Sequence, residues 1–180
     1  MGKIACGVAA LCGFTAGGLL NILLLDGAAD DRLKQHGINT FFSAVKPPGE
    51  TVGGLMVLYF LGCVVILLVA LIGAGPLLSG RYRSGALRGG WWQLDSISRL
   101  LASILLGALA VAVFNWRTMT DAYRDAAAYG EWYSVSTVAV AVPAMRDFTV
   151  RYVGILAALL IGSALVAFLA RRVADRAGGA

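Results

Sequence analysis

Charged side chains are scarce in this chain of 180 residues. Asp, Glu, Lys and Arg make up 14% of it, whereas an ordinary soluble domain contains about 25%. Hydrophobic residues account for 59% and form long blocks, and no charged residue lies between Glu50 and Arg81. Uninterrupted apolar blocks are typical of membrane helices. The composition therefore argues against an ordinary soluble domain and predicts an all-α integral membrane protein.

Residues that bind metals or carry out catalysis are equally scarce. His36 is the only histidine, which excludes haem held by two histidines of one chain and makes a Ser-His-acid set implausible. The three cysteines, Cys6, Cys12 and Cys63, lie in apolar blocks and form no CxxC pair. A four-helix thiol oxidoreductase would need such pairs, so we expect these cysteines to act as small apolar residues. The sequence predicts no catalytic residue, metal or cofactor.

Ionisable residues are also missing from the middle of the apolar blocks. Asp26 and Arg99 stand at the edges of two blocks, and the polar residues found deeper are Asn, Ser and Thr. Proton relays and coupled transporters usually place acids or histidines at membrane depth. This absence argues against a pump or a coupled transporter, and we do not expect the chain to be an enzyme.

Four apolar blocks are long enough to cross a bilayer, which takes roughly 20 residues. They predict a four-transmembrane-helix bundle forming a single domain over residues 1–180, with spans at residues 4–25, 52–78, 97–116 and 152–170. The first block exceeds the usual apolar core of a signal peptide, so an uncleaved helix is favoured over cleavage after Gly27-Ala28-Ala29. Gly73, Gly75 and Pro76 predict a kink or an early end of the second helix.

Between the spans lie polar connections, whose own structure is harder to predict. Asp95 or Ser96 can cap the third helix, and Gly37 is expected to stop a short solvated helix in the first connection. The segment Val135–Met145 is too short to span a membrane and contains Pro143. A re-entrant dip, a surface-lying helix and an extended segment all remain open for it.

Small residues recur at helical spacing in the first and fourth blocks. Such stripes let helices approach closely, and an Asn can hydrogen-bond across the contact. Packing within the chain and contact with a partner subunit remain alternatives. The predicted helix-packing or partner-interface residues are Gly13, Gly17, Asn21, Gly154, Ala158 and Gly162.

Aromatic and basic residues gather in the connections. An amphipathic pattern predicts a short interfacial helix in the first polar loop, with a loop that tucks its aromatic side chains between helices as the alternative. The predicted interfacial or partner surface comprises Ile38, Phe41, Phe42, Val45, Trp132 and Tyr133. A second set of residues is predicted to anchor the chain at the membrane surface, where arginines bind anionic lipid headgroups and tryptophans join the aromatic belt. These residues are Arg81, Arg83, Arg88, Trp91 and Trp92.

The distribution of charge favours one orientation. With four spans, the termini share a side with connection 79–96, and this side holds eight of the fifteen basic residues but only two of the ten acidic ones. The opposite side contains the loops 26–51 and 117–151. Arginine density near the helix ends therefore predicts cytoplasmic termini, connection and tail 171–180. Abundant Arg, Ala and Gly favour a bacterial source with a GC-rich genome, and hence the bacterial inner membrane.

By elimination, the sequence predicts a non-catalytic inner-membrane subunit of a larger assembly, such as a secretion, conjugative transfer or other envelope machine. The expected partners are membrane lipids with anionic headgroups and either other membrane subunits or further copies of the chain. The net charge of +5 is not taken as a sign of nucleic-acid binding, because of where the charges lie. The alternative function is an oligomeric channel or small-solute transporter, for which Thr15, Asn21 and Ser103 are candidate pore residues.

Overall fold

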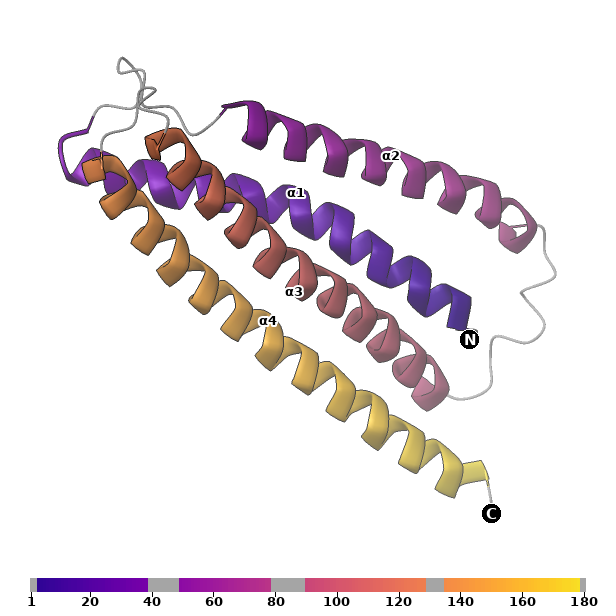
Figure 1. The fold of residues 1–180 in the computed structure, drawn as a ribbon. Helices are drawn as coiled ribbons and strands as arrows, with labels where there is room; N and C mark the ends of the chain where they lie inside the picture. The colour runs from indigo at the N-terminus through magenta and orange to yellow at the C-terminus, as the bar shows by residue number, and fades with distance from the viewer. Residues whose placement is uncertain (1–2, 39–48, 79–89, 129–134, 179–180) are drawn as a thin grey trace.

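The computed structural model describes residues 3–38, 49–78, 90–128 and 135–178, and in this part of the chain all regular structure is helical (Figure 1). The four helices are α1 (Lys3–Gln35), α2 (Gly49–Leu78), α3 (Gly90–Ala128) and α4 (Val135–Gly178). Each contains a segment long and apolar enough to cross a membrane. The predicted all-α architecture with four candidate spans is confirmed at this level and indicates a multi-pass membrane protein.

Successive helices run in opposite directions, so the N- and C-termini lie at the same end of the molecule (Figure 1). Helix α1 contacts all three other helices, and α3 packs extensively against both α1 and α4. Helix α2 lies at the side, where it packs on α1, barely touches α3 and makes no contact with the described part of α4. The result is a compact α1–α3–α4 unit with α2 attached along α1.

Three of the helices are much longer than the predicted spans. With 33, 39 and 44 residues, α1, α3 and α4 measure about 50, 58 and 66 Å at 1.5 Å per residue. The hydrocarbon core of a bilayer is only about 30 Å thick. These helices therefore have enough length to pass beyond a bilayer. The polar segments that follow the apolar stretches of α1 and α3 and precede that of α4 lie together at the end opposite the termini (Figure 1).

The C-terminal end of α1 shows why the helix stops where it does. The residues from Asp26 onwards continue α1 without a break instead of forming a separate short helix. Gly37 then takes a φ of +75°, and its N–H donates to the Lys34 carbonyl at 2.9 Å. The Ile38 N–H donates to the Leu33 carbonyl at 3.0 Å. This pair of bonds is a Schellman motif, and it confirms that Gly37 ends the helix.

Helix α4 begins well before the predicted fourth span. The segment Val135–Met145 is its first three turns, so neither a re-entrant dip nor an extended strand is present there. Pro143 lies inside the helix, where it removes one backbone hydrogen bond. Its ring is on the exposed side of α4, so it does not disturb the packed face.

Two further expectations about helix ends were wrong. Helix α3 begins at Gly90, so Asp95 and Ser96 lie inside it and do not cap it. Asp95 is instead buried and accepts a 2.8 Å hydrogen bond from Arg99 Nε, one turn along. Helix α2 continues to Leu78 through its glycines and Pro76, so the early end was wrong, whereas the alternative of a kink stays a prediction. Long apolar stretches thus outweighed local breaker residues.

The core is concentrated at the end opposite the termini. Its larger cluster joins α1, α2, α3 and α4 through fully buried side chains, including Leu33, Tyr59, Met119, Tyr123 and Met145. A smaller cluster of Leu105, Ala108 and Leu156 joins α3 to α4 nearer the termini. The helices lie close together around the larger cluster and diverge toward the termini (Figure 1). Tertiary packing is therefore strongest where the helices carry their polar segments.

Candidate functional site

The most deeply buried polar groups form a network that joins three helices. Tyr59 of α2 donates its hydroxyl to Asn115 Oδ1 of α3 at 2.7 Å. Asn115 Nδ2 in turn donates to Asn21 Oδ1 of α1 at 3.1 Å and to the Gly18 carbonyl at 3.2 Å. Asn21 and Asn115 have no exposed surface, and Tyr59 has 1%. This network is the principal polar connection between α2 and the rest of the described chain.

Glycine and an aromatic neighbour position Tyr59 in this network. A Cβ atom at Gly18 would lie 2.7 Å from ring atom Cε1 of Tyr59, so only glycine leaves room for the ring. The ring of Phe14 meets the Tyr59 ring edge-on, with centroids 5.9 Å apart. Interhelical hydrogen bonds of this kind contribute about 0.6 kcal/mol each on average in membrane proteins. The network therefore holds α2 in register against α1 and α3, and its chemistry is structural.

The first small-residue stripe faces α3. A Cβ atom at Gly13 would lie 1.9 Å from the Ile104 carbonyl oxygen, and one at Gly107 would lie 2.0 Å from the Ala10 carbonyl oxygen. At Gly17 a Cβ atom would lie 2.8 Å from the Cβ of Ala108. Of the two alternatives for Gly13, Gly17 and Asn21, the structure places all three at a contact within the chain. None of them lies on an outward surface.

The second small-residue stripe faces outward. Apart from the chain neighbours and the nearby backbone of α4 itself, no heavy atom lies within 4 Å of a Cβ atom built at Gly154 or at Gly162. Ala158, between them, is exposed. Within the described chain this stripe therefore packs against no other helix, in contrast to the stripe on α1.

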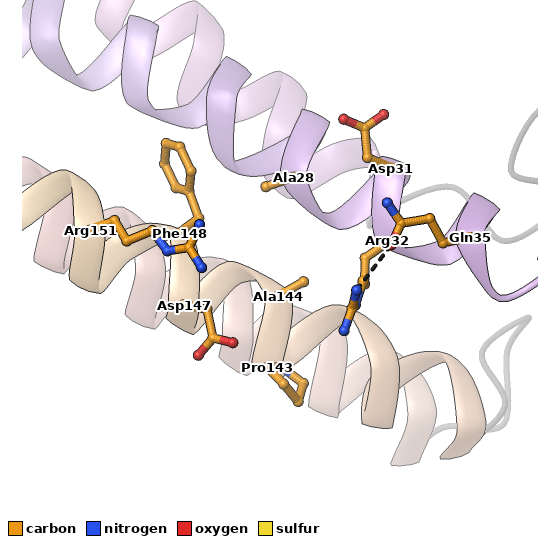
Figure 2. A pocket seen from close by; sticks show the side chains of 9 residues that line it. All are labelled: Ala28, Asp31, Arg32, Gln35, Pro143, Ala144, Asp147, Phe148 and Arg151. Atoms are coloured by element: carbon orange, nitrogen blue, oxygen red, sulfur yellow. Dashed lines mark hydrogen bonds between the residues drawn. The ribbon is translucent and has the colours of Figure 1, made fainter.

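A charged groove separates α1 from α4 on the side of the larger core cluster. Figure 2 shows its walls, and the groove has a volume of about 340 Å³. Its lining combines small or apolar residues with charged or polar ones. The lining residues are Ala28, Asp31, Arg32 and Gln35 of α1 and Pro143, Ala144, Asp147, Phe148 and Arg151 of α4.

The charges around this groove are only partly neutralised by one another. Arg32 donates a 3.0 Å hydrogen bond to Gln35 Oε1 on its own helix. Asp147 accepts two long hydrogen bonds of 3.4 Å from its neighbour Arg146, which does not line the groove. Among the described residues, Asp31 and Arg151 form no ion pair. Arg32, Arg151 and Asp31 therefore remain available to a charged ligand, whereas Asp147 is neutralised only by its long contact with Arg146.

Several predicted surface residues fall outside the described part of the chain. These are Phe41, Phe42, Val45, Trp132, Tyr133, Arg81, Arg83 and Arg88. Trp91 and Trp92 belong to the first turn of α3, and their side chains are likewise outside the described part. Ile38 is described, and as the last residue of the Schellman motif it packs against the larger core cluster.

The remaining polar candidates make local contacts. Thr15 Oγ1 donates to the Leu11 carbonyl at 3.0 Å, and Ser103 Oγ donates to the Arg99 carbonyl at 2.9 Å, each within its own helix. His36 Nδ1 lies 2.9 Å from the Arg32 carbonyl and is exposed. No group of three or more His, Cys, Asp or Glu side chains in the described ranges is arranged to hold a metal ion.

Sequence reasoning singled out Asn21 but missed its pairing with Asn115, and it missed the groove altogether. The signal for the groove was spacing, because its residues recur every three or four positions from 28 to 35 and from 144 to 151. That spacing becomes visible only when both segments are taken as continuous helix. No protein-family model matches this chain, and no curated protein or solved structure matches it either.

Proposed function

We propose that this chain is a non-catalytic, polytopic subunit of a larger membrane-protein assembly. The observation that carries this proposal is the continuation of α1, α3 and α4 beyond their apolar stretches as one packed unit. Met119 and Met145 are fully buried in that unit and join α3 to α4. A rigid helical unit outside the bilayer offers a defined surface to other proteins, whereas a lipid anchor alone requires no such structure.

The arrangement of α2 supports the same proposal. One face of α2 packs on α1, while most of its large apolar side chains point away from the molecule; Phe60 and Leu61 are 59% and 56% exposed. Side chains of this kind need an apolar environment, which lipid or a neighbouring subunit can provide. The outward stripe on α4 offers a second helix face to another subunit.

The proposed setting is the inner membrane of a bacterium, with both termini in the cytoplasm, and the proposed assembly is a secretion, conjugative transfer or other envelope machine. The distribution of charge supports this orientation, because arginines lie close to the helix ends on the terminal side and eight of the ten acidic residues lie on the loop side. A reporter that fluoresces only in the cytoplasm, fused after Ala180, should fluoresce. A dark fusion in a strain that accumulates the protein would contradict this orientation.

The subunit proposal is tested by purification from the native host in a mild detergent, followed by native electrophoresis and mass spectrometry. We expect a stoichiometric complex containing other membrane proteins. Charge reversal of Asp121 and Arg124, which are exposed on the α3 part of the extended unit, should weaken this complex. Charge reversal of the exposed Arg176 at the opposite end is the matched control.

Two results would overturn the proposal. One is isolation of the chain alone or as a homo-oligomer, with no other protein in stoichiometric amount. The other is ion or solute flux in liposomes that Asn21→Leu abolishes, as an oligomeric channel would show. Asn21 is fully buried against Asn115 inside the protomer, so we expect no such flux.

A further inference from the structure

The groove between α1 and α4 lies where the apolar stretches of both helices give way to polar sequence. Leu25 ends the apolar stretch of α1, and Ala28 is the first groove residue after it. On α4, Arg151 lines the groove and Tyr152 begins the apolar stretch. If the apolar stretches cross a bilayer, the groove therefore opens at the depth of the lipid headgroups.

Opposite charges occupy different parts of the groove. The side chain of Arg32 reaches from α1 toward α4, and that of Arg151 lies along α4 beside Phe148, whereas the carboxylates of Asp31 and Asp147 point outward on either side (Figure 2). Guanidinium groups are well suited to phosphate because they present several N–H donors in one plane. The two carboxylates are suited to an ammonium group. The groove as a whole thus matches a ligand that carries one charge of each sign.

Apolar surface continues directly from the groove along both helices. On α4, Ile155 and Leu159 follow Arg151 at one and two turns and are 62% and 54% exposed. The outward stripe of Gly154, Ala158 and Gly162 shares this face, because its residues lie seven and eleven positions from groove residues. On α1, the exposed Leu24 and Leu20 precede Ala28 by one and two helical turns, in the apolar stretch of that helix. A soluble phosphate compound would make no use of this surface, whereas an acyl chain would.

We propose that this groove binds a zwitterionic phospholipid with a phosphoethanolamine headgroup. The phosphate lies between Arg32 and Arg151, and the ammonium group pairs with Asp31 or Asp147. An acyl chain descends along α4, where the glycines leave space beside the helix. A purely anionic headgroup fits less well, because the two carboxylates repel additional negative charge. This lipid site is independent of the subunit function proposed above.

The test is native mass spectrometry of the full-length protein after removal of lipid, with defined lipids added back. Phosphatidylethanolamine should be retained as one tightly bound molecule, in preference to phosphatidylglycerol. Replacement of both Arg32 and Arg151 by Gln should weaken retention about tenfold or more, because two charge-assisted hydrogen bonds are lost. Arg117→Gln is the matched control, since Arg117 is exposed beside the apolar stretch of α3 and lies outside the groove.

A second pair of variants tests the apolar part of the site. Ala158→Leu fills the outward stripe and should weaken retention of phosphatidylethanolamine, whereas Ala164→Leu adds the same side chain at an exposed position on another face of α4. Circular dichroism and free energies of unfolding establish that all variants fold. Equal retention of both lipids, unaffected by the arginine variants, would overturn the proposal in favour of non-specific annular lipid. Inorganic phosphate that displaces the lipid, together with an inert Ala158→Leu, would overturn it in favour of a soluble anion.

Discussion

Replacing Tyr59 with Phe removes one hydroxyl group from the buried network and leaves the ring in place. Asn115 Oδ1 then loses the hydrogen bond it accepts at 2.7 Å, in a site with no exposed surface. A buried acceptor left without its donor costs about 1–3 kcal/mol in soluble proteins, and membrane-protein hydrogen bonds reach about 1.7 kcal/mol at most. We therefore expect Tyr59→Phe to lower the free energy of unfolding by about 1–2 kcal/mol.

Asn115→Leu is expected to cost more, about 2–3 kcal/mol, because it removes all three hydrogen bonds of the network. Tyr59, Asn21 and the Gly18 carbonyl all lose their bond to Asn115. Once Asn115 is gone, the hydroxyl of Tyr59 has lost its partner. Tyr59→Phe should then cost close to nothing in the Asn115→Leu background, which corresponds to a coupling energy of about 1 kcal/mol or more.

The free energies of unfolding can be measured by steric trapping in bicelles for the wild type, both single variants and the double variant. Tyr152→Phe is the matched control, because it makes the same chemical change at a half-buried residue of α4 outside the network. It should stay within about 0.5 kcal/mol of the wild type. Equal costs of Tyr59→Phe in the two backgrounds would refute the idea that these residues stabilise the fold as one network.

Four further substitutions have definite expected outcomes in the same unfolding assay. Gly13→Ala should lower the free energy of unfolding by at least about 1–3 kcal/mol, because the added Cβ would clash with the Ile104 carbonyl. Gly162→Ala is its control, because a Cβ there lies in open space and should leave the stability unchanged or raise it slightly. Equal effects of the two substitutions would contradict the close contact between α1 and α3. Pro143→Ala should stabilise the protein by about 1–3 kcal/mol by restoring a helical hydrogen bond, and destabilisation would contradict a continuous α4. Met145→Ala should cost about 2–5 kcal/mol and speed hydrogen exchange in residues 136–145; a cost below about 1 kcal/mol would show that the extended unit is loosely packed.

The apolar stretches of this chain could be predicted because their signal is local and strong. Some twenty consecutive apolar residues favour a helix whatever the rest of the chain does, since in lipid every backbone polar group must be satisfied within the segment. The C-terminal end of α1 was equally predictable, because Gly37 accepts the positive φ that a Schellman motif requires. Both conclusions depend on residues that are close together in sequence.

The polar ends of the helices could not be predicted in the same way. Residues 117–128 and 135–151 are helical because Met119, Tyr123, Ala141 and Met145 bury their side chains against one another and against α1. From the sequence, the segment Val135–Met145 with Pro143 left three conformations open, and residues 117–128 were assigned to a polar loop. Burial of apolar side chains at long range outweighed these weak local preferences.

The sequence by itself determined the number of candidate spans, their alternating direction and the scarcity of ionisable side chains within them. Only the tertiary structure decided which small-residue stripe packs inside and which faces out, because both have the same spacing and differ only in what lies opposite. It also decided that Asn21 and Asn115, 94 positions apart, share a hydrogen bond. The groove has the same origin, because Arg32 and Arg151 line one groove only when α1 and α4 pack side by side.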